Sequence, residues 1–100
     1  AVSWQRLMSD LPRHYGTDAS LDEPVRQSLA TWLDANASRK RLEAPPEDRI
    51  TKSRWFVREH DEVPANAWRR ASIKTAANCS ACHSGAAQGD YDEHGVRIPR

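Results

Sequence analysis

The sequence predicts an all-α fold, in the form of a small helical protein that is rich in loops. Apolar residues recur at helical spacing along the chain, and no stretch shows the two-residue alternation typical of a β-strand. The length of 100 residues allows one small domain with a modest core. Only 38% of the residues are hydrophobic, so an apolar cofactor would compensate for the small number of core residues.

The first expected helix lies at the N-terminus, where Ser3 is placed to cap its start and Pro12 to end it. Its apolar stripe consists of Trp4, Leu7, Met8 and Leu11. Residues spaced in this way lie on one side of a helix and predict a face turned towards a core.

The second expected helix begins with a capping box formed by Ser20 and Glu23, has Pro24 in its first turn and ends near Asn36. Its apolar face consists of Leu21, Val25, Leu29, Trp32 and Leu33. After it we expect a short polar helix over 38–43 and an extended link at Pro45 and Pro46. A third helix is expected from Thr51 or Ser53 to before Pro64, followed by a turn of helix over 65–70. The last expected helix covers 75–83 and is closed by Gly85. The glycine-containing tail that follows indicates an irregular loop.

The charge balance excludes some classes of function. There are 15 basic and 14 acidic residues, for a net charge of +1, and they are dispersed. A nucleic-acid-binding protein would gather its basic residues on one face, and the only basic cluster here is the run 38–41. No apolar run approaches membrane-spanning length, so we expect a soluble protein whose export signal, if it had one, has been removed.

The motif that carries chemistry is Cys79-Ser80-Ala81-Cys82-His83, because C-x-x-C-H is the attachment pattern of c-type haem. Two cysteines three residues apart on a helix share one face, so both thiols can reach the two vinyl groups of one porphyrin. The adjacent His83 is then placed to bind the iron as the proximal ligand. A disulfide between such close cysteines would add little stability, which favours a chemical role.

Three other interpretations of this motif remain open at this point. A thioredoxin-like dithiol also uses C-x-x-C, but no strand pattern precedes Cys79. Structural zinc could combine both cysteines with two histidines, yet His60 and His94 are too irregularly spaced to form a compact second ligand pair. The third interpretation is a chance match without function.

The identity of the sixth iron ligand decides the function, because methionine raises the reduction potential, histidine leaves it lower, and an open site binds small ligands. The candidates are His14, His60, His94 and Met8. His60 follows Trp55 and Phe56 on the third expected helix, so aromatic side chains could pack beside the porphyrin there. Met8 lies on an apolar stripe and His94 in the tail, and the spacing alone leaves the choice open.

The chain as a whole resembles the bacterial dihaem cytochromes c. The segments that carry the resemblance are Ser3-Trp4, His14-Tyr15-Gly16, Ala19-Ser20-Leu21-Asp22, Arg49-Ile50-Thr51, Arg58-Glu59-His60, Val63-Pro64, Ala77-Asn78-Cys79 through His83, Gln88-Gly89-Asp90-Tyr91-Asp92 and Arg97-Ile98-Pro99-Arg100. This combination is more specific than a haem motif alone.

The resemblance implies two haems, each held by two histidines. It makes His83 the proximal and His60 the distal ligand of the C-terminal haem, and His14 the distal ligand of an N-terminal haem. The sequence contains a single C-x-x-C-H. We therefore expect residues 1–37 to be the remnant of a first haem domain and residues 38–100 to be the C-terminal haem-binding part, in a fragment rather than in a relative that has lost a haem.

The resemblance also implies a function, which is single-electron transfer at low potential in the periplasm and not enzymatic catalysis. Covalent haem attachment takes place outside the bacterial cytoplasm, which supports this location. The implied partners are a b-type membrane cytochrome as donor and a small oxygen-binding monohaem cytochrome as acceptor. The alternatives are an open-site haem protein that binds small gases and, without haem, a zinc-stabilised module.

Overall fold

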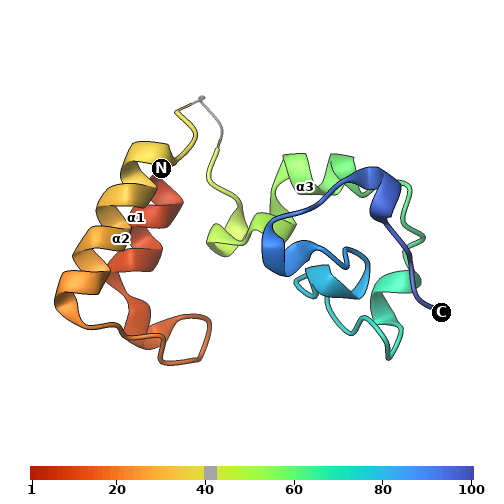
Figure 1. The fold of residues 1–100 in the computed structure, drawn as a ribbon, viewed down its shortest axis with the longest axis horizontal. Helices are drawn as coiled ribbons and strands as arrows, with labels where there is room; N and C mark the ends of the chain where they lie inside the picture. Colours follow the sequence, from red (N-terminus) through yellow and green to blue (C-terminus); the bar gives the residue numbers. More distant parts are fainter. Residues whose placement is uncertain (40–42) are drawn as a thin grey trace. The chain divides into compact units, whose positions relative to one another are not determined.

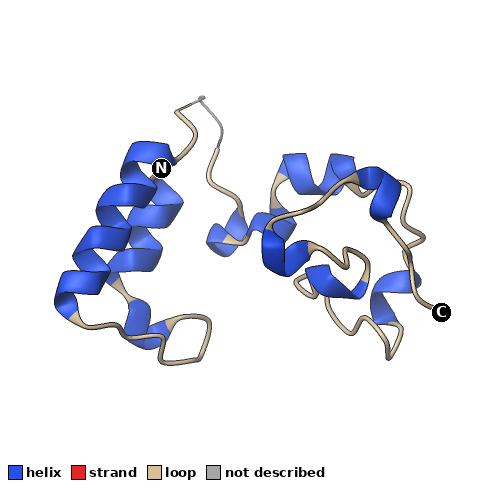
Figure 2. Ribbon diagram, viewed as in Figure 1, coloured by secondary structure: helices blue, strands red, loops and turns tan. Residues whose placement is uncertain are grey.

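The structure is a computed structural model that describes residues 1–39 and 43–100. The described residues form helices, turns and loops without any strand, which confirms the predicted all-α class (Figure 2). The chain divides into two compact units, Ala1–Arg54 and Trp55–Arg100 (Figure 1). Residues 40–42 lie outside the described residues, and with them half of the expected polar helix over 38–43 and half of the basic run 38–41.

The first unit is built on two α-helices. In order, its elements are α1 (Val2–Ser9), η1 (Leu11–Arg13), α2 (Glu23–Asn36), η2 (Pro46–Asp48) and η3 (Ile50–Lys52). The end of α2 at Asn36 and the position of Pro24 in its first turn are as predicted. Both expected N-caps are wrong. Helix α1 begins before Ser3, and Asp22 precedes α2 while the Ser20 hydroxyl donates to Asp18.

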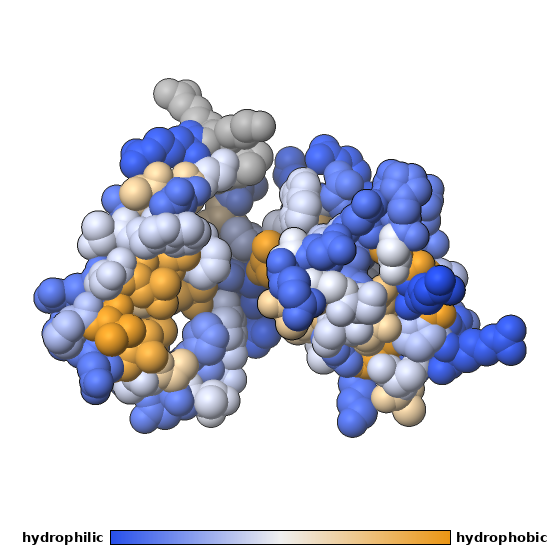
Figure 3. Space-filling model, viewed as in Figure 1, coloured by the Kyte–Doolittle hydropathy of each residue, from blue (hydrophilic) through white to orange (hydrophobic). Residues whose placement is uncertain are grey.

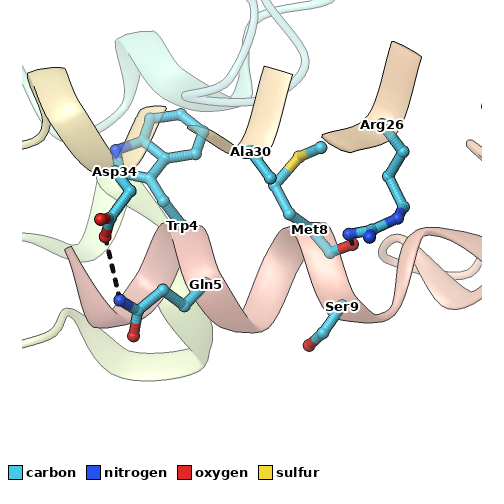
Figure 4. A pocket seen from close by; sticks show the side chains of 7 residues that line it. All are labelled: Trp4, Gln5, Met8, Ser9, Arg26, Ala30 and Asp34. Carbon is cyan, nitrogen blue, oxygen red and sulfur yellow. Dashed lines mark hydrogen bonds between the residues drawn. The ribbon is translucent and has the colours of Figure 1, made fainter. Parts of the chain in front are cut away.

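The contact between α1 and α2 forms the small core of this unit. Met8 is 6% exposed and Leu11 is 8% exposed. Figure 4 shows Trp4 and Met8 beside α2, with a hydrogen bond from the Gln5 amide to Asp34 at 3.0 Å. These side chains line a hollow of about 180 Å³ between the two helices.

The apolar face of α2 is largely exposed, contrary to the expectation that it packs into a core. Its exposed members are Val25, Leu29 and Trp32, and Leu21, which precedes the helix, is exposed as well. Apolar side chains accordingly gather on the surface of this unit (Figure 3). Helix α1 has 8 residues and α2 has 14, so α1 is too short to cover the whole of α2.

Hydrogen bonds between polar side chains link the η2 turn to α1. The Ser3 hydroxyl and the Arg6 guanidinium both donate to the Asp48 carboxylate, at 2.7 and 2.9 Å. The Tyr15 hydroxyl lies 3.1 and 2.9 Å from the carbonyl oxygens of Glu47 and Asp48. These bonds hold a turn in which Glu47 and Asp48 both have positive φ angles of 58° and 55°.

The second unit has one short α-helix and four 3-10 turns. They are α3 (Arg54–Glu59), η4 (Ala67–Arg69), η5 (Cys79–Ala81), η6 (Ala86–Gln88) and η7 (Glu93–Gly95). Its buried core residues are Ala67 and Ile73, which are 0% and 1% exposed. The expected helix over 75–83 is wrong, because only Cys79–Ala81 is helical and as a 3-10 turn.

Candidate functional site

The cysteine-bearing segment is a tight turn that begins at Cys79 and ends before Cys82. Residues three apart eclipse each other in a 3-10 helix, so the change from the expected α-helix to η5 leaves Cys79 and Cys82 on one side. The Cys79 carbonyl accepts the backbone N–H groups of Cys82 and His83, at 3.2 and 2.8 Å. Both thiols are half-buried and form no disulfide, and burial raises the pKa of the Cys82 thiol.

Val96 and Arg97, near the C-terminus, form backbone contacts with the end of this turn. His83 and Val96 form an isolated antiparallel bridge, and the Arg97 N–H donates to the Cys82 carbonyl at 3.1 Å. Directly after the motif, Gly85 lies so close to Asp90 that an added Cβ would be 2.7 Å from the Asp90 Cβ. The chain can therefore turn back here only because residue 85 has no side chain.

Helix α3 brings a second imidazole to this turn. His60 directly follows the last residue of α3, and its Nδ1 lies 2.8 Å from the Phe56 carbonyl oxygen. Since a carbonyl can only accept, this bond needs the proton on Nδ1, and in the neutral ring that leaves the Nε2 lone pair for a metal. The centroid of the His60 ring lies 6.2 Å from that of His83, with 78° between the two planes.

This separation suits a single metal ion between the two rings. A metal about 2.0 Å from each coordinating nitrogen, with each ring centre about 1 Å further out, would separate the centroids by about 6 Å. The observed 6.2 Å agrees with this value. The donor set of two imidazoles beside two half-buried thiols therefore fits a covalently attached haem.

Aromatic rings surround the two imidazoles. Phe56 stacks on His60 with 4.0 Å between centroids and 18° between planes. The ring centroid of Trp68 lies 6.0 Å from that of His60, and the centroid of Tyr91 lies 5.3 Å from that of His83, with 65° between the latter two planes. The sequence predicted the turn that carries Trp68 but assigned no role at this site to Trp68 or Tyr91, since neither belongs to a recognisable ligand pattern.

His14 lies in the first unit. It is half-buried in the turn that bridges His14 and Thr17, and its Nδ1 is buried without a hydrogen-bond partner among the described residues. A hollow of about 270 Å³ adjoins it, lined by residues that include Arg6, Arg13 and Asp48. A buried ring nitrogen without a partner is compatible with a missing ligand or metal.

The other two candidates for the sixth ligand are occupied elsewhere. Met8 is buried in the core of the first unit. The His94 side chain is 86% exposed, and its Nδ1 lies 2.9 Å from Asp92. Hydrogen bonds from the backbone N–H and then the ring of His94 lower the pKa of Asp92.

The geometry also bears on the zinc alternative. Among residues 1–39 and 43–100, no group of three or more His, Cys, Asp or Glu side chains is arranged to hold a metal ion. A four-ligand zinc site built on Cys79 and Cys82 would need two further ligands beside them. The described structure provides no such set.

Comparison with known proteins settles the family. The family model described as dihaem cytochrome c matches residues 1–91. The chain belongs to the dihaem cytochrome c family. It is accordingly an electron-transfer protein with haem c. The segment Cys79–His83 fits the one C-x-x-C-H attachment site in the sequence.

Solved structures agree with this assignment. The chain is 30% identical to the diheme cytochrome type c from Shewanella baltica OS155, with a TM-score of 0.80 over 98% of this chain and 75% of that one. Two structures of the diheme cytochrome c from Rhodobacter sphaeroides are 42% and 39% identical, with TM-scores of 0.72 and 0.73. They match 90% and 89% of this chain and 77% and 78% of theirs. No protein of curated function matches the sequence.

The helices also bear on membrane association. Every helix in the described part of the chain is too short or too polar to cross a bilayer.

Electron transfer within the family makes other redox proteins its natural partners.

Proposed function

We propose that this chain carries single electrons at low potential through a haem c whose iron is held by His83 and His60. The observation that carries the proposal is the pair of imidazoles with centroids 6.2 Å apart. When bound, the haem supplies a one-electron couple, and two histidine ligands keep its potential below that of a His/Met cytochrome. No proton or substrate needs to move at the site.

The chain's own residues orient the two ligands. The bond from His60 Nδ1–H to the Phe56 carbonyl directs Nε2 away from the helix and strengthens the ring as a donor. On the other side, the backbone bond to Cys79 and the bridge to Val96 fix His83. Ligands held in this way need little rearrangement when the iron changes charge, which suits rapid electron transfer.

The proposal extends to the rest of the family pattern. His14, with its buried and unpartnered Nδ1, serves as the distal ligand of the family's second haem. Residues 1–37 belong to the region of that haem, and residues 38–100 to that of the C-terminal haem. The protein works in the periplasm, between a b-type membrane cytochrome and a small oxygen-binding monohaem cytochrome.

Carbon monoxide binding to the reduced protein tests the ligation. With His60 on the iron, the wild-type protein should bind carbon monoxide slowly or not at all. His60→Ala should open the site and allow rapid binding, because it removes the imidazole that the proposal places on the iron. His94→Ala is the matched control, since its side chain is 86% exposed, and it should behave as the wild type does.

The opposite result would support the open-site alternative. If the wild-type protein bound carbon monoxide as fast as His60→Ala, His60 would not be an iron ligand. The protein would then be better described as a haem protein that binds small gases.

A further inference from the structure

Phe56 contacts His60 in two ways that act on different properties of the imidazole. Its carbonyl oxygen lies 2.8 Å from Nδ1, and its ring stacks on the imidazole with 4.0 Å between centroids and 18° between planes. The two residues are four apart at the end of α3, the spacing at which helical side chains meet. The hydrogen bond sets the protonation and direction of the ring, whereas the stacking sets its plane.

Trp68 lies close to both rings of the stacked pair. The Trp68 ring lies 6.1 Å from Phe56 and 6.0 Å from His60, tilted by 44° and 53°. A rotation of the imidazole about its metal–nitrogen axis would break the stacking on Phe56. The side chain of Phe56 therefore restricts the one rotation that a coordinated histidine retains.

We propose that Phe56 is a positioning residue that holds the plane of His60 nearly perpendicular to that of His83. The angle between the two imidazoles is 78°. This inference rests on the proposed ligation by both histidines. Its consequence is electronic, because each imidazole donates π-density to the metal orbital perpendicular to its own plane. Perpendicular planes leave two such orbitals nearly equal in energy, and parallel planes split them.

Electron paramagnetic resonance of the ferric protein measures this splitting. Nearly perpendicular ligand planes give a strongly anisotropic low-spin signal with one very large g value, whereas parallel planes give a rhombic signal with three resolved g values. The wild-type protein should show the large-g signal from the haem at Cys79–His83. A purely rhombic low-spin signal would overturn the proposal without any variant being needed.

Variants then assign the effect to the aromatic ring. Phe56→Leu removes the stacking but keeps the backbone carbonyl, so the hydrogen bond to His60 can persist. Its large-g signal should weaken or broaden, with a rhombic signal appearing in its place. Phe56→Tyr keeps a ring and should restore the wild-type signal. Trp55→Leu is the matched control, since Trp55 is a neighbour on α3 that is 53% exposed, and it should leave the signal unchanged.

Each result separates this inference from the proposed function. A Phe56→Leu signal identical to that of the wild type would overturn the positioning role while leaving bis-histidine ligation intact. A change as large in Trp55→Leu would overturn it as well. A high-spin signal in the unmodified ferric protein would instead refute the ligation, and with it the proposed function.

Discussion

Ile73 is the large side chain on which the packing of the haem-binding unit most depends. It is 1% exposed, and its carbonyl accepts the Asn78 amide at 3.0 Å, directly before the cysteine motif. Ile73→Val removes one buried methylene and should cost about 0.5–1.5 kcal/mol, and Ile73→Ala about 2–5 kcal/mol, in the free energy of unfolding. At about 0.05–0.15 kcal/mol per residue, a unit of this size is stable by only a few kcal/mol, so Ile73→Ala should remove half or more of its stability.

The assay is guanidinium unfolding of the ferric holoprotein, followed by far-ultraviolet circular dichroism. Ile98→Ala is the control, because it makes the same change in the same unit at a position that is 38% exposed. Its cost should be well below that of Ile73→Ala. If the two alanine variants unfolded at the same denaturant concentration, Ile73 would not be the centre of this core.

Two further predictions concern the backbone and the charge of surface turns. Gly89 has a φ angle of 74°, and a Cβ added there would meet open space. Gly89→Ala should therefore lower the free energy of unfolding by about 1–2 kcal/mol through backbone strain alone, as measured by thermal melts. Gly95→Ala should be nearly neutral in the same measurement. The hydrogen bond from Ser3, and then the bond and charge of Arg6, lower the pKa of Asp48 below its ordinary value of 3.8. The ionised carboxylate therefore stabilises the fold above pH 3.8, and this stabilisation is lost as the pH falls through the lower pKa of the folded state. Asp48→Asn should remove this part of the loss of stability in acid. Thermal melts across the pH range measure it.

Local signals in the sequence predicted the helices well where local bonds decide the structure. Pro24 and the apolar spacing located α2. The helix expected from Thr51 or Ser53 to before Pro64 contains α3, which spans only Arg54–Glu59. Hydrogen bonds within a helix involve neighbours in the sequence, so such signals are sufficient for these elements.

The expected helix over 75–83 failed because side chains there bind the backbone instead. The Asn78 amide donates to the Ile73 carbonyl, and the Thr75 hydroxyl accepts the Ala77 N–H at 3.3 Å. Lys74, directly before this segment, has a φ angle of 70°, so the chain enters the segment through a turn. Side-chain bonds of this kind compete with helix formation and depend on turns that periodicity does not show.

The candidate site was only partly predictable for a different reason. The motif identified Cys79, Cys82 and His83, because their roles follow from spacing within five residues. The imidazole that lies 6.2 Å from His83 belongs to His60, which is 23 positions away in the sequence. Its approach depends on how the loops between α3 and η5 fold, so the residues alone left His60 beside other candidates. Tyr91 follows His83 by only eight residues, but its ring contact also depends on how the intervening loop turns back.

The near-infrared spectrum of the unmodified ferric protein tests the central claim most directly. Its porphyrin-to-iron charge-transfer band moves with the axial ligands, and methionine adds a characteristic band at the red end of the visible range. Ligation by His83 and His60 predicts a low-spin spectrum with the bis-histidine band and without the methionine band. A methionine band, or a high-spin spectrum from an open site, would contradict the account.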